Sequence, residues 1–530
     1  MKKIFNYILN LVLFGHTFLG NNNFKSINKS SEYQLYKVKS ELEKNLSEKI
    51  ENFKNKKNVN IEVFSIQYLF NHLINNKYFN QKILQCIDTK KSFFFPLPSD
   101  CLNIINKNGI NVNFTKSNFL WKLYLILNFT YQNIKFIYNF KFYFSQKEPN
   151  LRNKTLIYLD SIPKIDHETE HDTRLNNFYH WCIFFLNNNE KRITNNIVFF
   201  HNNKQISYQK MIIDKFQCEI IYKEKYFFDN LNVYKYLVSY FRSLVTLSKL
   251  GIEFLTALNS LHELEYIKKT NTKIAEHSFF NNSKMVVKPM YLNYELEKDK
   301  KKSDYLYFFS TNIIPLCEKP QEVPNLFGYR IQNWSSYILW NSLQKKWLEH
   351  CIDKDFTSYN IDSIIPFEGK NIFIQKNHKR VVIFDVPPKK EEYFNNYMHV
   401  ENLYTVDYCR KYLTDTVTAS ISECNLEVFY KIKRNLKSTD KQYKKLINTF
   451  VLKEKKFNIF YDDISAQSLI QSSDAAISIP FTSSALVADV YGIPSIYYSP
   501  KDLNFDGNFF PTDGKYISNL TELKKWLKKI

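Results

Sequence analysis

The chain has 530 residues, 44% of them hydrophobic and 24% charged, which excludes a disordered protein and predicts two domains with decorations. It holds 46 Phe and 37 Tyr against 9 Gly, and the excess of Asn, Lys, Ile, Phe and Tyr is typical of an AT-rich genome. Much of the net charge of +21 is therefore background lysine, which is dispersed along the chain and predicts no nucleic-acid partner.

Cysteine usage and hydropathy point to the cytoplasm. Eight cysteines are scattered without CxxC spacing, which predicts free thiols in a reducing compartment. Polar residues interrupt the N-terminal run at 4–19, which lacks a small-x-small cleavage site and predicts an amphipathic helix, not a signal peptide. No apolar run reaches the roughly 18 residues of a membrane span. Residues 119–127 predict a buried helix, with an interfacial helix facing a membrane as the alternative.

In chain order, the first elements predicted are helices over residues 30–90, from their apolar spacing. Short apolar runs then predict strands at residues 109–114, 155–159, 196–200, 218–222 and 306–309. Between them lie a helical stretch at 233–264 and a Lys/Asn-rich loop at 265–304. A Pro-rich stretch at 315–324 and a helix at 344–351 follow. Alternating strands and helices predict a parallel sheet with covering helices.

The C-terminal third alternates most cleanly. Strands are predicted at residues 381–384, 426–430, 457–461, 475–479 and 495–498. Helices are predicted between them at residues 402–413, 464–471 and 483–491. This pattern predicts a doubly wound domain, which binds ligands at the carboxyl ends of its strands.

A hydroxyl cluster follows the fourth of these strands. Pro480 closes the strand, and Thr482, Ser483 and Ser484 stand where a helix begins. Such a helix start offers backbone N–H groups and a positive dipole end, which suit a phosphate or diphosphate. A plain helix cap is the alternative interpretation.

Two further features close strands of the same sheet. Lys431, Lys433 and Arg434 end the second strand, where cations can neutralise the phosphates of a departing nucleotide; a solvated basic turn is the alternative. Asp385 and Pro387 follow the first strand in a stiff loop that either brackets a base or sugar or forms a simple turn.

Three segments carry a family resemblance. Residues 476–488, with 491–498 after them, resemble the motif of the polysaccharide biosynthesis PFTS-motif proteins. Residues 306–312 and 384–388 are similar to other marks of that family, so the resemblance covers roughly residues 300–500.

More distantly, the layout resembles GT-B glycosyltransferases that use cytidine nucleotides. Those enzymes carry a K-x-H-P element after one strand and a Ser/Thr cluster after a later one. Residues 431–434 stand where K-x-H-P would, but His and Pro are absent, which puts the cytidine assignment in doubt. The resemblance implies a CMP- or CDP-activated sugar as substrate, no cofactor and no required metal.

The fold that the resemblance implies is α/β and GT-B-like, with two facing Rossmann-like domains, parallel sheets and a helical N-terminal extension. The expected units are the extension (1–100), an acceptor domain (101–370), a donor-nucleotide domain (371–515) and a C-terminal helix packing back (516–530). Ser310, Thr311 and Asn312 are expected in the interdomain cleft.

Transfer to a hydroxyl also needs a general base, normally from the N-terminal domain. Asp160, at the end of a strand there, is the candidate catalytic residue, with a turn residue as the alternative.

A zinc-protease motif is the main competing signal. His167-Glu168-Thr169-Glu170-His171 matches H-E-x-x-H, and Glu190 stands at a tolerable distance for a third ligand. The motif follows a strand in a polar stretch without apolar periodicity, so a zinc metallopeptidase is a remote alternative.

The resulting prediction is a bacterial glycosyltransferase of capsule or lipopolysaccharide biosynthesis that moves a sugar from a nucleotide-activated donor to a glycan or lipid-linked acceptor. It is expected in the cytoplasm, with peripheral association at the inner membrane face. The absence of GxSxG, Walker A and GxGxxG removes support from hydrolase, kinase and dehydrogenase activities. A catalytically inactive GT-B scaffold for glycan assembly is the alternative.

Overall fold

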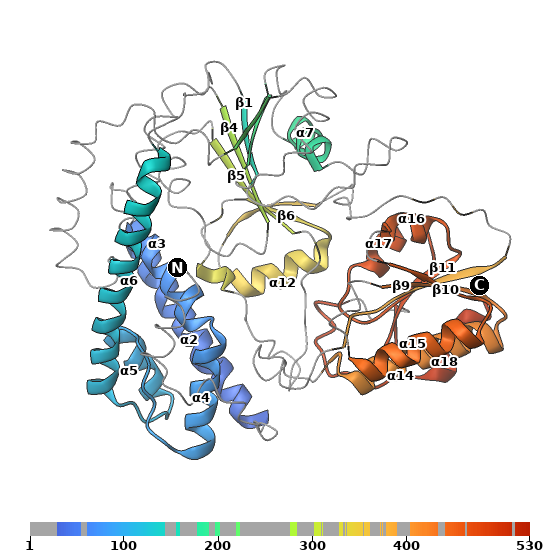
Figure 1. The fold of residues 1–530 in the computed structure, drawn as a ribbon, viewed down its shortest axis with the longest axis horizontal. Coiled ribbons are helices and arrows are strands. Elements are labelled where there is room, and N and C mark those ends of the chain that lie inside the picture. Colours follow the sequence, from blue (N-terminus) through green and yellow to red (C-terminus); the bar gives the residue numbers. More distant parts are fainter. Residues whose placement is uncertain are drawn as a thin grey trace.

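The computed structural model contains a helical N-terminal region and two α/β units (Figure 1). It describes residues 29–54, 61–143, 155–159, 178–189, 197–201, 219–222, 276–282, 302–308, 310, 328–331, 334, 336–352, 355–360, 372, 374, 378–388, 403–432, 440–461, 464–510 and 515–530.

The helical region has a hydrophobic core of its own. Its elements are α2 (Lys29–Lys54), α3 (Ile61–Leu69), the π-helical turn η2 (Phe70–Ile74), α4 (Lys77–Thr89), α5 (Ser99–Lys107) and α6 (Phe114–Tyr143). One face of α2 packs into this core through apolar residues spaced three and four apart: Leu35, Val38, Leu42, Leu46 and Ile50. The helices predicted over residues 30–90 are therefore present.

The strand predicted at residues 109–114 is wrong. Val112 forms only an isolated parallel bridge with Phe93, and α6 begins at Phe114. Asn113 caps that helix, because its side-chain oxygen accepts a hydrogen bond from the N–H of Lys116 at 3.0 Å. The cap ends the extended segment before a ladder can form, and α6 continues to Tyr143.

The first α/β unit is a seven-stranded, all-parallel sheet in the order β3-β2-β1-β4-β5-β6-β7. Its strands are β1 (Thr155–Leu159), β2 (Ile197–His201), β3 (Glu219–Tyr222), β4 (Glu276–Asn282), β5 (Lys302–Tyr307), β6 (Ser336–Leu339) and β7 (Thr357–Asn360). The chain starts at β1, moves to one edge and then crosses back past β1, which is the doubly wound order. The helices of this unit are α7 (Phe178–Asn189), the 3₁₀ turn η5 (Tyr329–Ile331) and α12 (Ser342–Ile352).

Part of this sheet departs from the predicted elements. The segment 265–304, predicted as a loop, contains all of β4 and the start of β5, and β5 begins at Lys302 rather than at residue 306. β4 has the polar sequence Glu-His-Ser-Phe-Phe-Asn-Asn, yet it pairs with β1 on one edge and β5 on the other. Backbone pairing on both edges outweighs a weak apolar pattern. The helix predicted at 233–264 lies outside the described residues.

The second α/β unit is a six-stranded parallel sheet in the order β10-β9-β8-β11-β12-β13. Its strands are β8 (Arg380–Phe384), β9 (Glu427–Lys431), β10 (Phe457–Phe460), β11 (Ala475–Ser478), β12 (Ser495–Tyr498) and β13 (Tyr516–Ile517). Numbered within the sheet, the order is 3-2-1-4-5-6, the Rossmann order. Five of these strands match the predicted ones within a residue.

Helices cover both faces of this sheet (Figure 1). One face carries α14 (Val406–Thr418) with the π-helical turn η6 (Ala419–Glu423), α15 (Lys441–Lys453) and α18 (Leu520–Leu527). The other face carries α16 (Ala466–Gln471) and α17 (Ser484–Val490). Leu523 and Leu527 of α18 join the core of this same unit, so the C-terminal helix packs back onto the second sheet.

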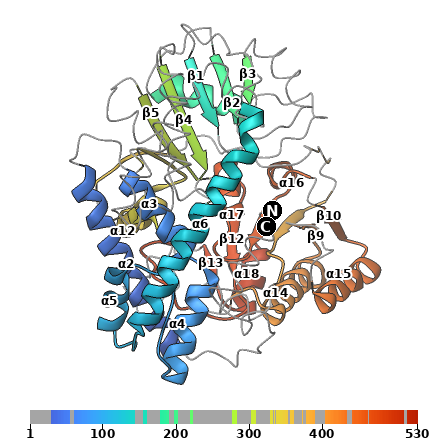
Figure 2. The same ribbon diagram turned by 60° about the vertical axis from the view of Figure 1, so that its left-hand side comes forward.

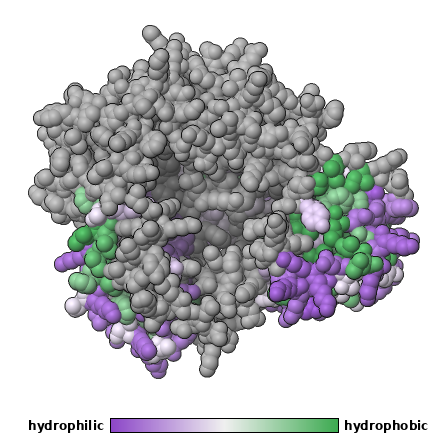
Figure 3. All heavy atoms as spheres, viewed as in Figure 1, coloured by the Kyte–Doolittle hydropathy of each residue, from purple (hydrophilic) through white to green (hydrophobic). Residues whose placement is uncertain are grey.

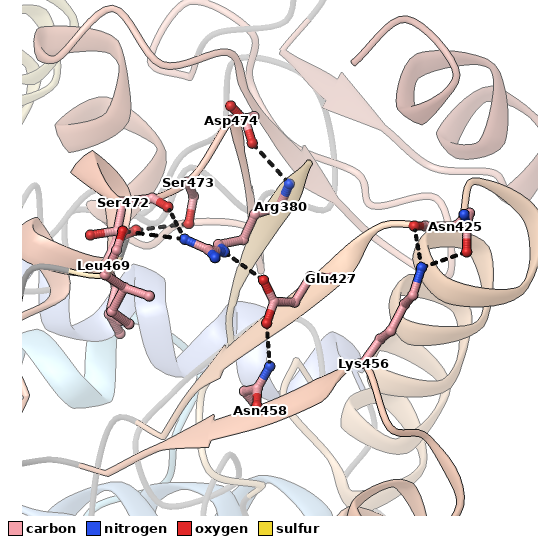
Figure 4. A network of polar contacts seen from close by, with 10 residues as sticks. Arg380, Asn425, Glu427, Lys456, Asn458, Leu469, Ser472, Ser473 and Asp474 are labelled. Atoms are coloured by element: carbon pink, nitrogen blue, oxygen red, sulfur yellow. Dashed lines mark hydrogen bonds and ion pairs between the residues drawn. The ribbon is translucent and has the colours of Figure 1, made fainter. Parts of the chain in front are cut away.

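A buried arginine joins the amino ends of the strands in the second unit (Figure 4). The side chain of Arg380 is 3% exposed; its Nε lies 2.8 Å from Glu427 Oε2, and its guanidinium donates to the carbonyl of Ser472 at 3.0 Å. Asn458 donates to the other oxygen of Glu427 at 2.9 Å. This network lies at the edge opposite the carboxyl ends of the strands, so it stabilises the sheet without approaching the candidate site.

The predicted fold class is confirmed: the chain is α/β, with two Rossmann-like parallel sheets and a helical N-terminal region. The two units meet at Trp340, directly after β6, which packs against the cluster formed by β8, α16 and α17. The domain boundaries remain a proposal. Since helices extend to Tyr143 and β1 begins at Thr155, we propose that the first sheet unit starts near residue 150 rather than at 101.

Candidate functional site

The strand order of the second sheet reverses between β8 and β11. Residues 385–388 follow β8, and residues 479–483 follow β11, at the same carboxyl edge. Ligands of doubly wound sheets bind in the crevice outside such a reversal. The two loops that the sequence marks in this domain therefore lie side by side at the position where this fold binds ligands.

The segment Pro480-Phe481-Thr482-Ser483, here called the PFTS loop, makes a sharp turn between β11 and α17. Phe481 has φ +62°, a left-handed conformation that costs a non-glycine residue about 1 kcal/mol. Its ring is 9% exposed and packs against the rings of Phe510 and Phe505, with centroids 4.8 and 6.0 Å away. Aromatic packing therefore offsets the backbone strain and fixes the direction of the turn.

The hydroxyl groups of the cluster bind one another and the loop itself. Thr482 Oγ1 donates to the carbonyl of Ile479 at 2.8 Å and lies 3.3 Å from Ser484 Oγ. Ser478 Oγ donates to Ser484 Oγ at 3.1 Å. Ser483 is the N-cap residue of α17, but its side chain makes no capping hydrogen bond. The hydroxyls of Thr482 and Ser484 thus shape the turn, and a phosphate would meet mainly the backbone N–H groups.

Three tyrosines, of which Tyr412 and Tyr497 are buried and Tyr404 is half-buried, hold the two loops from the core side. Tyr404 donates to the carbonyl of Pro480 at 2.7 Å, and Tyr497 donates to the carbonyl of Thr482 at 2.8 Å. Tyr412 donates to the last residue of β8, at the carbonyl of Phe384 (2.9 Å), and lies 3.3 Å from the carbonyl of Ile477 in β11. Burial raises the pKa of each tyrosine above its ordinary value, so all three hydroxyls stay protonated as donors.

Asp385 faces the core beneath the switch point. Its side chain is 4% exposed, and its Oδ2 accepts hydrogen bonds from Tyr430 and from Tyr443, the latter at 2.5 Å. Burial, and then the Asp385 charge, raise the pKa of both tyrosines well above their ordinary value. The carboxylate therefore positions the loop after β8 from below, while half-buried Pro387 lies further along that loop.

Lys431 ends β9 with its ammonium turned onto the backbone. Its Nζ donates to the carbonyl of Ile432 at 3.0 Å and to that of Tyr461 at 2.7 Å, and the residue is 6% exposed. These bonds fasten the carboxyl ends of β9 and β10 together. The other predicted cations of this turn, Lys433 and Arg434, lie outside the described residues.

Most of the remaining predicted residues also lie outside the described residues: Asp160, Thr311, Asn312 and the motif His167 to His171 with Glu190. Ser310 is described and half-buried; its carbonyl accepts a hydrogen bond from Gln344 Nε2 at 3.4 Å. Within the part of the chain that the structure describes, no three His, Cys, Asp or Glu side chains gather as a metal site would require.

Sequence reasoning missed the three tyrosines that support the loops. Tyr404 precedes α14, Tyr412 lies within it, and Tyr497 lies inside β12, so none is in a loop that follows a strand. In a chain with 37 Tyr, no local pattern separates these residues from ordinary core aromatics. Their role follows only from the fold.

Three solved structures resemble the chain at low sequence identity. A glycosyltransferase from Rickettsia africae ESF-5 has a TM-score of 0.36 and 10% identity, over 71% of this chain and 88% of that one. A mutant of S. aureus TarM in complex with fondaparinux, alpha-GlcNAc-glycerol and UDP has a TM-score of 0.37 and 10% identity, over 71% and 92%. Anabaena HepE in complex with UDP and glucose has a TM-score of 0.38 and 10% identity, over 71% and 89%.

No curated protein matches the chain. The family model of the polysaccharide biosynthesis PFTS motif proteins matches residues 248–527. That segment runs from before β4 to α18 and includes the switch point with the PFTS loop. Because the match spans more than half of the 530 residues, the chain belongs to the polysaccharide biosynthesis PFTS motif protein family.

Proposed function

We propose that this protein is a glycosyltransferase of surface-polysaccharide biosynthesis, acting on capsule or lipopolysaccharide. It transfers a sugar from a nucleotide-activated donor to a glycan or lipid-linked acceptor. One observation carries the proposal: the PFTS loop lies beside the β8 loop at the switch point of a Rossmann-ordered sheet. Membership of a polysaccharide biosynthesis family supports a sugar nucleotide as the ligand of that crevice.

The chemistry proposed at this site is electrostatic. The backbone N–H groups of the PFTS loop and of the first turn of α17 face the donor phosphates, and Lys433 and Arg434 neutralise the departing nucleotide. Hydrogen bonds of Thr482 and Ser484 support the shape of that cradle, and Ser483 is proposed to contact the donor beside them. A donor held in this way needs no metal ion.

The acceptor side of the reaction is assigned to the first sheet unit. Asp160 follows β1 directly and is the proposed general base, which takes the proton of the acceptor hydroxyl. Ser310, Thr311 and Asn312 follow β5 and are proposed to line the cleft between the two units. Trp340 supports this placement, because the two units already meet at its side chain.

A panel of nucleotides tests the donor assignment. Thermal unfolding of the purified protein with saturating CMP, CDP, UDP or GDP should show a higher Tm with one of them, by roughly 2–4 °C at about 100 times Kd. The same shift should shrink in Arg434→Ala and in Ser483→Ala. If no nucleotide raises Tm, the chain is better described as an inactive scaffold in glycan assembly.

A further inference from the structure

The long outer helix α6 (Phe114–Tyr143) has one face in the core and an opposite face that is both exposed and apolar. Trp121 and Tyr124 are 8% and 4% exposed and belong to the core of the helical region. On the other side, Phe119 is 66% exposed and Ile126 is 63% exposed. These two residues are seven apart, so they lie on one stripe about 10 Å long.

Among the described elements, the figures place α6 on the outside of the helical region. In Figure 2, which turns the left-hand side of Figure 1 toward the viewer, α6 runs in front of the other helices of its region. Figure 3 shows hydrophobic side chains at the surface of the left-hand edge, over the position that α6 has in Figure 1.

Positive charges flank the stripe. Lys116 and Lys122 are exposed, and their positions fall on opposite sides of the line through Phe119 and Ile126. The sequence of α6 contains no Asp or Glu. At the start of the helix, the ammonium groups of Lys116 and Lys82 lie 3.7 and 4.0 Å from the centre of the Phe94 ring.

The lysines around Phe94 are close enough to repel one another. The pKa of Lys82 is lowered, first by burial and then by the neighbouring charges of Lys116 and Lys91. Asp100, the one acidic residue in the sequence of α5, is paired with Lys49 at 2.5 Å. An anionic surface would relieve this repulsion while it covered the apolar stripe.

We propose that this face of α6 docks on an anionic lipid surface. Phe119 and Ile126 enter the boundary between headgroups and acyl chains, and Lys116 and Lys122 contact lipid phosphates. This inference deepens the proposed function, because it names the surface that would bring the enzyme to a lipid-linked acceptor. Peripheral binding fits the structure, since no described helix is both long and apolar enough to cross a bilayer.

A second exposed apolar pair offers a matched control. Val451 and Leu452 on α15 are 47% and 85% exposed and have lysines nearby. They are adjacent in sequence and so do not repeat along a helix face, and Glu454 follows them. Substituting this pair removes a similar amount of exposed apolar surface, but from a site where the apolar residues do not form a stripe along the helix.

Cosedimentation with vesicles tests the proposal. The full chain should bind phosphatidylcholine vesicles containing about one quarter phosphatidylglycerol, and bind pure phosphatidylcholine at least about tenfold less. The double variant Phe119→Ser/Ile126→Ser should lose about tenfold in partitioning, and Lys116→Glu/Lys122→Glu should lose at least as much. The control Val451→Ser/Leu452→Ser should bind like the unmodified protein.

Three results would overturn the docking face: no vesicle binding, equal loss in the α15 control, or a dimer in solution that Phe119→Ser/Ile126→Ser dissociates. The last would assign the face to a second copy of the chain. Thermal unfolding verifies that each variant is folded. The nucleotide-induced rise in Tm should survive in both α6 variants, so failure of the docking face and failure of the donor site give different results.

Discussion

Single hydroxyl groups position the PFTS loop. Tyr404 and Tyr497 each donate one hydrogen bond to a carbonyl of that loop, from beneath the crevice. Replacing either by Phe keeps the ring but leaves a buried carbonyl without its donor. We expect each substitution to lower the free energy of unfolding by about 1–2 kcal/mol.

Nucleotide affinity should fall several-fold in the same two variants, because the loop loses a fixed point next to the donor phosphates. Denaturant unfolding and a nucleotide titration measure the two effects. Tyr461→Phe is the matched control, since that side chain is 57% exposed and directly follows β10, the edge strand, which is two strands from β8. If the control weakens binding as much as the two variants do, the tyrosines do not act through the loop.

Arg380, in contrast, is a buried residue that stabilises the sheet and lies away from the crevice. Its guanidinium is paired with Glu427 at 2.8 Å (Figure 4), so Arg380→Met leaves a half-buried carboxylate without its cation, with Asn458 as its remaining donor. We expect a loss of about 2–4 kcal/mol in the free energy of unfolding. Arg410→Met should cost little, because its partner Asp407 is 3.8 Å away and both side chains are exposed.

Chemical denaturation measures both arginine variants. Nucleotide binding at a temperature where Arg380→Met is still folded should equal that of the unmodified protein. Weakened binding in the folded variant would show that the amino edge of the sheet influences the crevice.

At the scale of elements, two buried ionisable side chains of α2 bind other elements: Glu43 contacts η5, and Lys39 contacts the residue that ends η2. Glu43 accepts a hydrogen bond from the N–H of Arg330 at 3.0 Å, and Lys39 donates to Asn75 at 2.9 Å. Burial, opposed by the Arg330 charge, raises the pKa of Glu43 to about 7, and burial lowers that of Lys39 to about 7. The contact between the helical region and the first sheet unit therefore responds to pH.

The direction of the pH effect on stability follows from the difference between the pKa of Glu43 in the folded chain and in the unfolded chain. The pKa of Glu43 is raised from 4.5 in the unfolded chain to about 7, so its stabilising protonation is complete below about 4.5 and is lost as pH rises through 7. Gln cannot ionise and keeps an oxygen for the Arg330 N–H. The Tm of Glu43→Gln relative to the unmodified protein should therefore rise, by a few degrees, between about pH 5 and pH 8.

Glu48→Gln is the control on the same helix, because Glu48 is exposed. Its Tm should follow the unmodified protein at each pH. A difference for Glu43→Gln that is constant with pH would mean that the carboxyl group of Glu43 does not titrate in this range.

Whether a helix or strand could be predicted from the sequence depended on how apolar its segment is. β8, β11 and β12 are short, almost continuous apolar runs between polar turns, and the sequence predicts each within a residue. β4 was missed because its strand character comes from pairing with two neighbours. The false strand at 109–114 has a suitable pattern, but the Asn113 cap converts its end into a helix start.

For the molecule as a whole, the sequence predicts the crevice better than the groups that support it. Pro480, Thr482 and Asp385 stand at strand ends, so strand order alone brings their loops together. Whether a side chain at such a loop faces the crevice or the core does not follow from strand order. Asp385 turns to Tyr430 and Tyr443, and Lys431 turns to backbone carbonyls, because both are satisfied inside the sheet.

The central claim is that a nucleotide phosphate rests against the PFTS loop. The side chain of Ser483 makes no capping hydrogen bond that α17 could lose, and Asp is as favourable as Ser at an N-cap position. Ser483→Asp should therefore preserve α17 while it places a negative charge in the phosphate position. Asn519→Asp adds the same charge at the N-cap of α18, which follows the edge strand β13, two strands from β11.

The most direct test of this claim is calorimetric titration of both variants. The ligand is the nucleotide that gives the largest rise in Tm. Ser483→Asp should weaken binding at least about tenfold, through repulsion of the phosphate, whereas Asn519→Asp should bind like the unmodified protein. Unchanged affinity in folded Ser483→Asp would contradict a phosphate at the PFTS loop.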